Sequence, residues 1–198
     1  MINFIDINKE EPHILFKKKY NDAINANQEN IEAVSKSSFN KEKSQVDSRY
    51  VNLKIVKGNN FIFFSNYNSK KAEQFSSNNN IAALFLWNKI NTQIRIKAKI
   101  HKLDNIESDT YFRKRQKEKN ALAISSMQST QIESFDKVKQ NFFHVLKNED
   151  LKKRPVYWGG YRFVPFEFEF WEGHMHRLNQ RTHYELKNGI WKKELLQP

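Results

Sequence analysis

The sequence contains no cysteine in its 198 residues. It therefore has no disulfide framework, no thiolate metal site and no cysteine nucleophile. Glycine (5 residues) and proline (4 residues) are scarce, which excludes a glycine-rich phosphate loop and leaves no marked domain boundary. No apolar run approaches the length that spans a bilayer, and the G-x-S-x-G and H-E-x-x-H motifs are missing. An enzyme of this composition is expected to take its reactivity from a cofactor.

Positive charge and aromatic residues are abundant. The net charge is +12, and the chain holds 16 Phe, 7 Tyr and 4 Trp, more aromatic residues than a disordered chain contains. We expect one folded domain over 1–198 with a basic surface. Such a surface suits nucleic acid, an anionic membrane or small phosphorylated molecules. The N-terminal stretch MINFIDINKEEPH has neither a basic leader nor an apolar segment, so we expect a cytoplasmic protein.

Alternating strand patterns dominate the hydrophobic periodicity. Ile94, Ile96, Ala98 and Ile100 alternate with basic residues, which is typical of a strand with one buried face. Because strands outnumber helices and do not alternate regularly with them, we predict a mainly β fold, an antiparallel barrel with peripheral helices. The expected strands are 50–56, 61–64, 81–87, 93–103 and 166–170, with turns at 58–60 and 188–189; helices are expected at 12–27, after a capping box at Asp104 and Glu107, and over 135–146; residues 35–48 are expected as a mobile loop or a weak strand.

Two lysines occupy the first turn of a predicted helix that begins after Ser69. Lys70 and Lys71 are unfavourable there against the helix dipole unless an anion lies between them. A phosphate would resolve the conflict, because free backbone N–H groups already point toward that position. Two solvated lysines on a surface helix are an equally good interpretation of this short segment.

A second group of polar residues follows a helical spacing. Tyr111, Arg115 and Lys119 are four residues apart and share one face if the helix continues through them. A phenol, a guanidinium and an ammonium together suit a phosphate ester. Periodicity alone favours an exposed basic run over this site.

A third group lies near the C-terminus. Arg177, Asn179 and Arg181 would face the same side of a strand, and two arginines on one face repel unless they share an anionic partner. His174 and His176 have the alternation of a metal pair but lack a third ligand, so we predict no metal site. Three cation clusters with nearby aromatic residues indicate a site for two phosphorylated molecules, and nucleic acid is an equally physical alternative at this point.

Ordered blocks along nearly the whole chain carry a family resemblance. They are Glu11-Pro12-His13-Ile14-Leu15-Phe16, Ser48-Arg49 through Lys54, Phe63-Phe64-Ser65-Asn66 with Ser69-Lys70-Lys71-Ala72, Tyr111-Phe112, Gln128-Ser129, Trp158-Gly159-Gly160-Tyr161-Arg162, Glu169-Phe170-Trp171-Glu172-Gly173 before Arg177-Leu178 and Arg181, and Leu195-Leu196-Gln197-Pro198. In these blocks the sequence resembles the pyridoxamine 5′-phosphate oxidase family of FMN-dependent enzymes. The resemblance implies an FMN-binding split β-barrel, a homodimer with FMN in clefts between the subunits, and no membrane partner. It does not favour nucleic acid.

The resemblance also implies roles for individual residues. The substrate phosphate is expected at Lys54, Tyr111, Arg115 and Lys119, while Arg177 and Asn179 are the catalytic candidates over the substrate ring. Residues 1–48 are expected as a helical or mobile N-terminal segment, and 156–198 as strands that complete the dimer and the active site. The implied FMN-binding residues are Arg49, Tyr50, Val51, Asn52, Phe64, Ser65, Lys70, Lys71, Gln93, Gln128, Ser129, Trp171 and Arg181.

Four positions depart from the family pattern. Lys70 stands where arginine is usual, Lys119 stands where serine is usual, and Asn179-Gln180 replaces a histidine followed by an acid. Asparagine donates and accepts hydrogen bonds, whereas histidine also titrates near neutrality. The residues for FMN are therefore more complete than those for proton handling at the substrate.

The implied activity is oxidation of pyridoxamine or pyridoxine 5′-phosphate to pyridoxal 5′-phosphate, with dioxygen reduced to hydrogen peroxide. One alternative keeps the fold and changes the substrate to another ring, such as a phenazine precursor. Another is a protein that binds FMN without catalysis, and a third is a basic barrel that binds nucleic acid.

Overall fold

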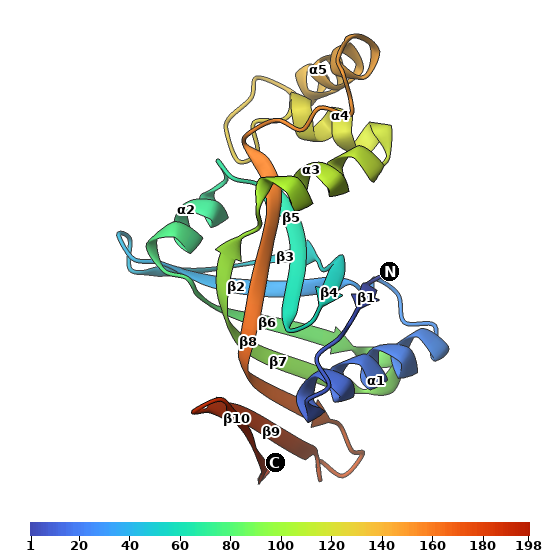
Figure 1. The fold of residues 1–198 in the computed structure, drawn as a ribbon, viewed down its shortest axis with the longest axis vertical. Helices are drawn as coiled ribbons and strands as arrows, with labels where there is room; N and C mark the ends of the chain where they lie inside the picture. Colours follow the sequence, from blue (N-terminus) through green and yellow to red (C-terminus); the bar gives the residue numbers. More distant parts are fainter.

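One ten-stranded sheet curves around the core, with helices at its edges (Figure 1). The computed structural model describes all residues, Met1–Pro198. No helix is both long enough and apolar enough to cross a membrane. The strands are β1 (Asn3–Ile5), β2 (Ala33–Asn40), β3 (Gln45–Asn52), β4 (Ile55–Lys57), β5 (Asn60–Asn66), β6 (Asn80–Trp87), β7 (Thr92–Lys102), β8 (Trp158–Glu172), β9 (Gln180–Lys187) and β10 (Ile190–Leu196). The helices are α1 (Glu11–Asn25), α2 (Lys70–Ser77), α3 (Asn105–Lys114), α4 (Lys117–Ser125) and α5 (Phe135–Asn148), with a 3₁₀ turn at Asn88–Ile90.

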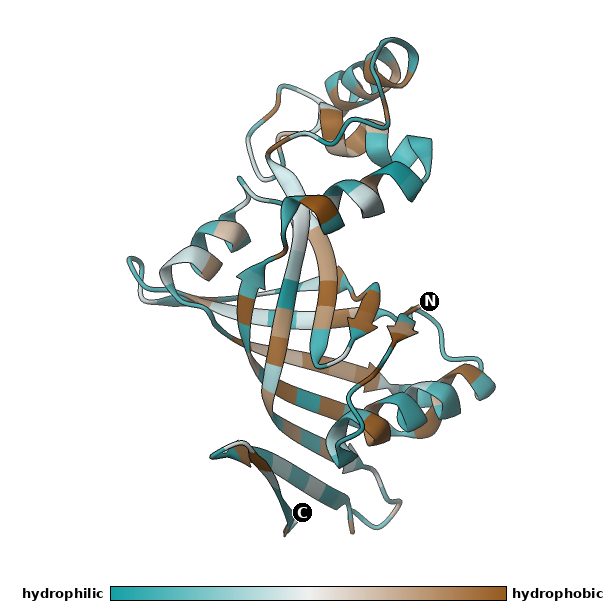
Figure 2. Cartoon of the chain, viewed as in Figure 1, coloured by the Kyte–Doolittle hydropathy of each residue, from teal (hydrophilic) through white to brown (hydrophobic).

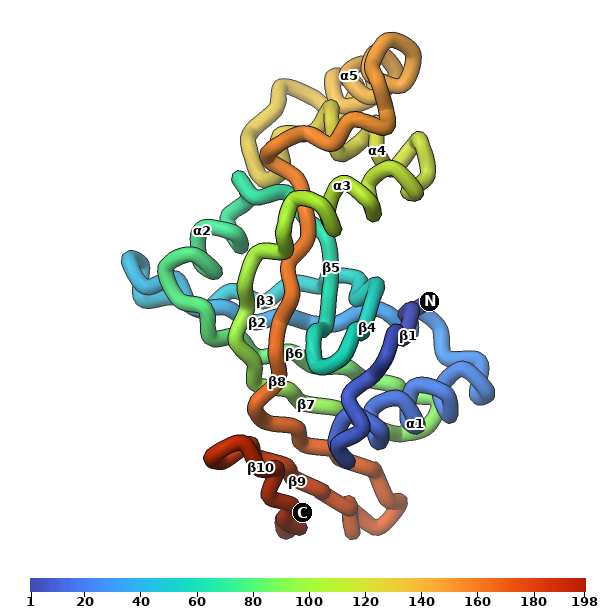
Figure 3. The backbone as a smooth tube through the Cα atoms, viewed as in Figure 1, coloured from blue at the N-terminus to red at the C-terminus, as the bar shows by residue number.

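The long strand β8 splits the barrel. Its first half pairs with β5 and its second half with β9, while β7 runs along its other edge. The strands follow the order β1-β4-β5-β8-β7-β6-β2-β3, and β10 extends the sheet beyond β9. All pairs are antiparallel except β1 with β4. β8 thus runs from the α3–α5 helices to the C-terminal hairpin (Figure 3), and the predicted mainly β barrel with peripheral helices is confirmed.

Several local predictions are confirmed. Buried and exposed residues alternate along β7, and Figure 2 shows alternating brown and teal bands on the sheet strands. The side chain of Asp104 accepts a hydrogen bond from the backbone N–H of Glu107 and caps α3. The β9–β10 hairpin turns at Asn188 and Gly189, whose φ angles of 53° and 79° are those of a type I′ turn.

One prediction in the first third of the chain was partly right, and another needs correction. Residues 35–48, predicted as a mobile loop or a weak strand, belong to the paired strands β2 and β3 on either side of a turn, so the strand alternative is confirmed. Its polar side chains bond to one another, as in the 2.7 Å contact between the hydroxyls of Ser37 and Ser48. The strand predicted over 50–56 is interrupted between Asn52 and Ile55, where the chain passes from β3 to β4. The first 48 residues thus contribute β1, α1, β2 and the start of β3.

The helix α1 closes one end of the barrel. Its Phe16 is fully buried and packs edge-on against Phe61 and Phe85 at centroid distances of 5.0 and 5.3 Å. Pro12 at the start of the helix suits a position whose N–H needs no partner. The interior is therefore built largely of aromatic rings.

The beginning of α1 is also hydrogen-bonded to the C-terminal hairpin. The carboxylate of Glu11 accepts hydrogen bonds from the hydroxyl of Tyr184 (2.8 Å) and from the ammonium of Lys193. Glu10 accepts a 2.7 Å hydrogen bond from the indole N–H of Trp191. These contacts join the two ends of the chain.

A buried histidine lies beneath this junction. His13 is 1% exposed, and neither ring nitrogen has a hydrogen-bond partner. The rings of Phe61, Phe168 and Trp191 surround it. Burial lowers the pKa of His13 from 6.5 to about 4, against a smaller opposing effect of Glu10.

Acid should therefore destabilise the fold through His13. As the pH falls below 6.5, His13 is protonated in the unfolded chain, whereas in the folded chain it stays neutral until about pH 4. The free energy of unfolding should fall by about 1.4 kcal/mol per pH unit across this window from this group alone. Urea unfolding of the His13→Phe variant should show a correspondingly flatter pH profile. The same substitution at the exposed His101 is the control, and an unchanged profile in His13→Phe would contradict the assignment.

Candidate functional site

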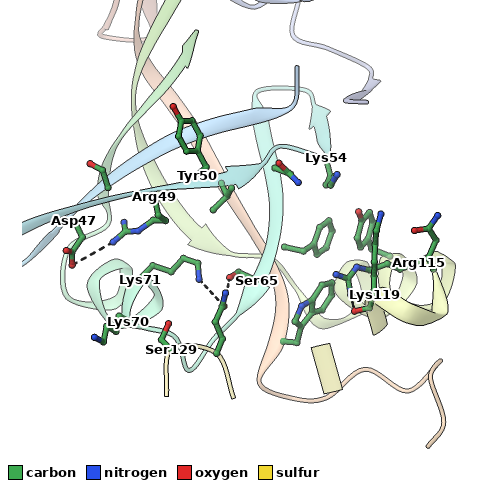
Figure 4. Close-up of a pocket in the computed structure, with 18 of the residues that line it drawn as sticks. Asp47, Arg49, Tyr50, Lys54, Ser65, Lys70, Lys71, Arg115, Lys119 and Ser129 are labelled. Atoms are coloured by element: carbon green, nitrogen blue, oxygen red, sulfur yellow. Dashed lines mark hydrogen bonds and ion pairs between the residues drawn. The ribbon is translucent and has the colours of Figure 1, made fainter. Parts of the chain in front are cut away.

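A cleft of about 920 Å³ opens beside β3 and β5. The start of α2, the α3–α4 junction and the loop after α4 form its other walls. Figure 4 shows its labelled cations on opposite sides, Arg49, Lys70 and Lys71 facing Lys54, Arg115 and Lys119. The lining residues are Asp47, Ser48, Arg49, Tyr50, Val51, Asn52, Lys54, Phe64, Ser65, Lys70, Lys71, Tyr111, Lys114, Arg115, Gln116, Lys119, Gln128, Ser129 and Trp158. Seven are basic and only Asp47 is acidic, so the cleft suits anions.

Lys71 is the most buried cation of the cleft. It is 9% exposed, and its ammonium donates 3.0 Å hydrogen bonds to Ser69 Oγ and Gln128 Oε1, both neutral groups. Burial, and then the charge of Arg49, lower the pKa of Lys71 from 10.5 to about 8. A buried ammonium without a carboxylate partner at the first turn of α2 is a strong anion site. The neighbouring Lys70 is exposed.

Arg49 lies beside Lys71 on β3. Its guanidinium donates to Ser38 Oγ and, at 2.9 Å, to Gln74 Oε1, and it lies 3.8 Å from Asp47. The nearest carboxylate is thus at the outer limit of an ion pair and leaves Arg49 charge available to a ligand. Ser129, on the same side of the cleft as Lys70 and Lys71 (Figure 4), has a left-handed φ of 73°, a conformation that non-glycine residues rarely adopt and that is common at functional sites.

Aromatic rings form the other side of the cleft. Phe64 stacks on Tyr111 with centroids 3.6 Å apart and planes 6° apart, and on Trp158 at 5.4 Å and 9°. The Arg115 guanidinium lies over the Trp158 ring at 4.9 Å. Burial raises the pKa of Tyr111, with Arg115 opposing the change, so its phenol stays a hydrogen-bond donor. This side combines flat apolar surface with a fixed cation.

Tyr111, Arg115 and Lys119 line the same cleft but do not share a helix face. α3 ends at Lys114, the chain is extended at Arg115, and α4 begins at Lys117. Arg115 Nη1 donates to the backbone oxygen of Lys119 at 2.6 Å. The condition of one continuous helix is not met, and Arg115 instead contacts the backbone of Lys119 across the break between the two helices.

Lys54 lines the same side of the cleft as Arg115, and it already forms an ion pair with a carboxylate of the chain. Its ammonium hydrogen-bonds Glu32, which also accepts from the N-terminal ammonium at 2.8 Å. Burial would raise the pKa of Glu32, but these two cations outweigh it and lower the pKa. Lys54 therefore contributes less net charge to the cleft than Arg115 or Lys119.

The remaining predicted residues do not line the cleft. Gln93, Trp171 and Arg181 lie next to one another on β7, β8 and β9, at paired positions. Trp158 lines the cleft at the start of β8, and Trp171 lies 13 residues further along the same strand, roughly 40 Å away if the strand were straight. Within one chain the predicted site is divided between the two ends of β8 (Figure 1).

Arg181 is held in place by a buried carboxylate. Glu169, 6% exposed, accepts from Arg181 Nε at 2.9 Å and lies 2.8 Å from its Nη2. The second oxygen of Glu169 accepts from Arg95 at 2.8 Å. Arg181 also donates to the backbone oxygen of Gln197, so its position is fixed without a ligand.

The prediction that Arg177, Asn179 and Arg181 share a strand face was wrong. β9 begins at Gln180, so Arg177 and Asn179 belong to the β8–β9 loop. Arg177 has a left-handed φ of 60°, and Asn179 Oδ1 accepts a hydrogen bond from the backbone N–H of His174 at 3.1 Å. Asn179 thus stabilises the loop that carries Arg177.

Trp158 is a cleft residue that the sequence did not assign to the site, although it opens the block Trp158-Gly159-Gly160. A Cβ on Gly159 would lie 2.2 Å from the Tyr67 hydroxyl, so only glycine allows β8 to approach that side chain. The two consecutive glycines were the sequence signal of a closely packed site that could have drawn attention to the preceding Trp158. Also missed were Asp47, Ser48, Lys114 and Gln116.

A further cation lies behind the cleft. Lys36 on β2 is fully buried, and its ammonium has no hydrogen-bond partner. It lies over the rings of Phe63 and Phe163 at 3.6 and 3.7 Å. A desolvated cation–π contact contributes about 2 kcal/mol, less than the several kcal/mol that burial of an ion costs. Burial, and then Arg49, accordingly lower the pKa of Lys36 well below its ordinary value.

Comparison with known sequences gives a consistent result. A family model described as "Pyridoxamine 5′-phosphate oxidase" matches residues 20–147, and one described as "Pyridoxine 5′-phosphate oxidase C-terminal dimerisation region" matches residues 158–198. The chain is 36% identical over 171 residues to a pyridoxine/pyridoxamine 5′-phosphate oxidase of Vesicomyosocius okutanii, covering 85% of this chain and 80% of that protein. It is 34% identical over 198 residues to one of Nostoc punctiforme, covering 98% and 90%.

Solved structures agree with the fold. PhzG from Burkholderia lata, in complex with tetrahydrophenazine-1-carboxylic acid, superposes with a TM-score of 0.90 at 25% identity, over 95% of this chain and 93% of that one. An FMN-binding protein related to pyridoxamine 5′-phosphate oxidase from Nostoc punctiforme has a TM-score of 0.76 at 10% identity, over 92% and 97%. The latter is similar in fold alone.

Proposed function

The chain belongs to the pyridoxamine 5′-phosphate oxidase family, and from this premise we propose that it is an oxidase that converts pyridoxamine or pyridoxine 5′-phosphate to pyridoxal 5′-phosphate, with dioxygen reduced to hydrogen peroxide. FMN is the cofactor. One observation carries the proposal: a single cleft holds cations on both sides and stacked aromatic rings on the side of Arg115. Two phosphorylated flat rings need this arrangement.

The side with Lys71 fits the FMN phosphate. Lys71 has only neutral partners, and Arg49 keeps a guanidinium edge beside it. Both offer charge that nothing in the chain neutralises fully, as a phosphate site requires. In the proposal Lys70 and Ser129 add further contacts to the phosphate or the ribityl chain, and the backbone of Tyr50, Val51 and Asn52 runs beside the flavin ring, with Phe64, Ser65 and Gln128 completing the pocket.

The side with Arg115 fits the substrate. Arg115 is oriented by Lys119 and by Trp158 before any ligand arrives, so little side-chain entropy is lost on binding. We assign the substrate phosphate to Arg115, Tyr111, Lys119 and Lys54. Among these, Arg115 supplies the bidentate contact and Lys54 the weaker one, because Glu32 already neutralises much of its charge.

A second subunit would complete the site. Residues 158–198 match a dimerisation region, and they carry Trp171, Arg177, Asn179 and Arg181 at the end of β8 away from the cleft. We propose a homodimer in which this end of one chain, together with Gln93, lies over the cleft of the other. A two-fold axis then forms two equivalent sites.

The chain's own residues bind and orient, and the cofactor supplies the redox chemistry. FMN held at Lys71 and Arg49 would supply the hydride acceptor for C4′ of the substrate and the reactivity toward dioxygen. The cations fix the substrate phosphate, the aromatic rings limit its tilt, and Arg177 of the other subunit covers the exposed face of the ring. This positioning keeps the reacting carbon near the flavin.

The visible spectrum tests the proposal. Purified protein should be yellow, and adding pyridoxine 5′-phosphate without oxygen should bleach the flavin absorbance. Air should restore the colour with formation of hydrogen peroxide. A yellow protein that is not bleached by either vitamer phosphate would retain FMN binding and exclude the proposed substrate; a colourless protein that takes up no added FMN would exclude both.

A second candidate is a flavin oxidase that acts on a phenazine precursor. The superposition on PhzG at a TM-score of 0.90 favours it, as does the absence of a titratable side chain at Asn179. Its substrate would carry a carboxylate on the ring in place of a phosphate ester. Bleaching by a reduced phenazine carboxylate, with no response to pyridoxine 5′-phosphate, would establish this alternative.

Arg177→Ala should separate turnover from cofactor binding. The Arg177 side chain comes from a loop with a left-handed backbone and is exposed in the single chain, so its loss removes a contact to the substrate and leaves the FMN phosphate site intact. We expect kcat with pyridoxine 5′-phosphate to fall by about 100-fold, at unchanged flavin content by absorbance. Unchanged kinetics would remove Arg177 from the mechanism.

A further inference from the structure

Lys36 is the one fully buried lysine of the chain, and its burial is unusual in kind. It lies on the inner face of β2, between the rings of Phe63 and Phe163, and its ammonium has neither an ion pair nor a hydrogen bond. Buried lysines are ordinarily paired. The charged form of such an unpaired lysine is stable only if a negative charge nearby compensates for the loss of hydration.

The charged groups around Lys36 are themselves mostly cationic. On β3 Arg49 is its direct cross-strand partner and donates to its backbone oxygen at 3.4 Å; Asp47 follows on the same strand, but faces Arg49 and Gln74. On α2 the cleft cation Lys71 interacts with the same Arg49. On β8 Tyr161 stacks on Phe63, and its buried hydroxyl has no partner, while β6 presents Ala83. The field at Lys36 is therefore set largely by Arg49.

Arg49 also lines the cleft, so the same guanidinium faces Lys36 on one side and the ligand on the other. Without an anion, burial and Arg49 both disfavour the charged form of Lys36, and the two rings favour it. A phosphate dianion held at Arg49 and Lys71 would offset the repulsion. The charge of Lys36 is then decided by whether the cleft is occupied.

We propose that Lys36 couples the cofactor site to proton uptake: it is uncharged while the cleft holds no anion, and it takes up one proton from solvent when a phosphate dianion binds at Arg49 and Lys71. The inference rests on the proposed FMN site and extends it to a residue outside the cleft. Lys36 does not touch the cofactor in this scheme and acts through the electrostatic field. Because linkage is reciprocal, FMN binds more tightly at pH values where Lys36 can become charged.

The effect has a definite sign. A charged Lys36 favours the bound dianion, so its contribution to FMN affinity is present at low pH and is lost as pH rises. Lys36→Met, which keeps the length of the side chain and removes the amine, should bind FMN about tenfold more weakly than the natural chain at pH 6.5. The two affinities should converge as the pH rises to the range where Lys36 is uncharged in both states.

The experiment uses the flavin-free full-length protein and measures FMN affinity by quenching of flavin fluorescence from pH 6.5 to 9.5. Calorimetry in buffers of different ionisation enthalpy counts the protons taken up per FMN. Lys71, whose pKa is about 8, contributes equally to both proteins, so the difference between them isolates Lys36. Riboflavin, which lacks the phosphate, should show no such difference, and Lys152→Met at an exposed position is the matched control.

Three outcomes bear on the inference. A lower proton uptake in Lys36→Met, with convergence at high pH, supports it. Equal proton uptake, or an affinity loss that is the same at every pH, overturns it while the FMN site stands; failure of the natural chain to bind FMN overturns the proposed function itself. Should Lys36→Met not fold, ¹³C NMR of lysine in the natural chain follows the charge of Lys36 directly, and an unchanged signal on FMN addition refutes the coupling.

Discussion

Lys71→Met should weaken FMN binding by about 100-fold. The substitution removes a charge-assisted hydrogen bond to the cofactor phosphate, a contact whose loss costs about 1.5–3 kcal/mol. It also removes a buried ammonium that has no carboxylate partner, so the chain without cofactor should fold at least as well as before. Titration of flavin-free protein with FMN, followed by fluorescence quenching, gives the affinity.

The same lysine predicts a pH dependence. Since its pKa in the free cleft is about 8, the affinity of the natural chain should fall above pH 8, where binding must first restore the proton, by up to about tenfold per pH unit. Lys70→Met is the comparison, because Lys70 lies in the same helical turn but is exposed; it should cost only a few-fold. Equal losses in both variants would contradict the assignment of Lys71.

Mixing two inactive variants should restore activity. Arg115 lies in the cleft of its own chain, and we propose that Arg177 acts in the cleft of the partner. Arg115→Ala and Arg177→Ala homodimers should each retain about 1% of the natural turnover at subsaturating substrate. After the subunits are mixed and exchanged, about half of the dimers are mixed, and each has one unaltered site and one doubly altered site. The activity should therefore recover to about a quarter of the natural value.

This recovery depends on the division of the site between chains. If both arginines served the cleft of the same chain, every site in a mixed dimer would carry one substitution, and no activity would return. Two samples of the same variant, mixed in the same way, control for the exchange procedure. Failure to recover in dimers shown to be mixed by mass would place Arg177 outside the partner's site.

Local sequence signals correctly predicted the elements that are determined by their own residues and near neighbours in the sequence. β7 has a strict alternation of apolar and basic residues, and the Asn188–Gly189 turn needs only the two positive φ angles that these residue types tolerate. The cap of α3 by Asp104 is likewise local. None of these depends on a distant part of the chain.

Elements that depend on distant contacts were missed. The break between α3 and α4 contains neither glycine nor proline, and it exists because Arg115 turns toward Trp158, Lys119 and Asn120. The polar sequence of β2 and early β3 left a mobile loop and a weak strand equally open, whereas in the structure Ser38 and Arg49 hydrogen-bond to Gln74 of α2. Tertiary partners of this kind leave no periodicity in the sequence.

The residues of the candidate site could be predicted from the sequence, but their positions relative to one another in the fold could not. Residue types identified three groups of cations, and the family resemblance joined them into one site. The sheet register instead separates Arg49 and Lys71 from Trp171 and Arg181 by most of the length of β8. In the proposed dimer these residues serve the partner's cleft, and no pattern within one sequence indicates such a role.

The hydrogen bonds of Glu10 and Glu11 to the C-terminal hairpin connect the amino terminus to residues that, in the proposed dimer, serve the neighbouring subunit. Removing these two carboxylates would therefore loosen the strand that carries Arg181, and in the proposed dimer the effect would reach the partner's cleft. Trimming the first dozen residues would in addition disturb the chain's own cleft, because it removes β1 and the N-terminal ammonium that shares Glu32 with Lys54. For protein engineering, fusions at the amino terminus are consequently the ones to join through a flexible spacer.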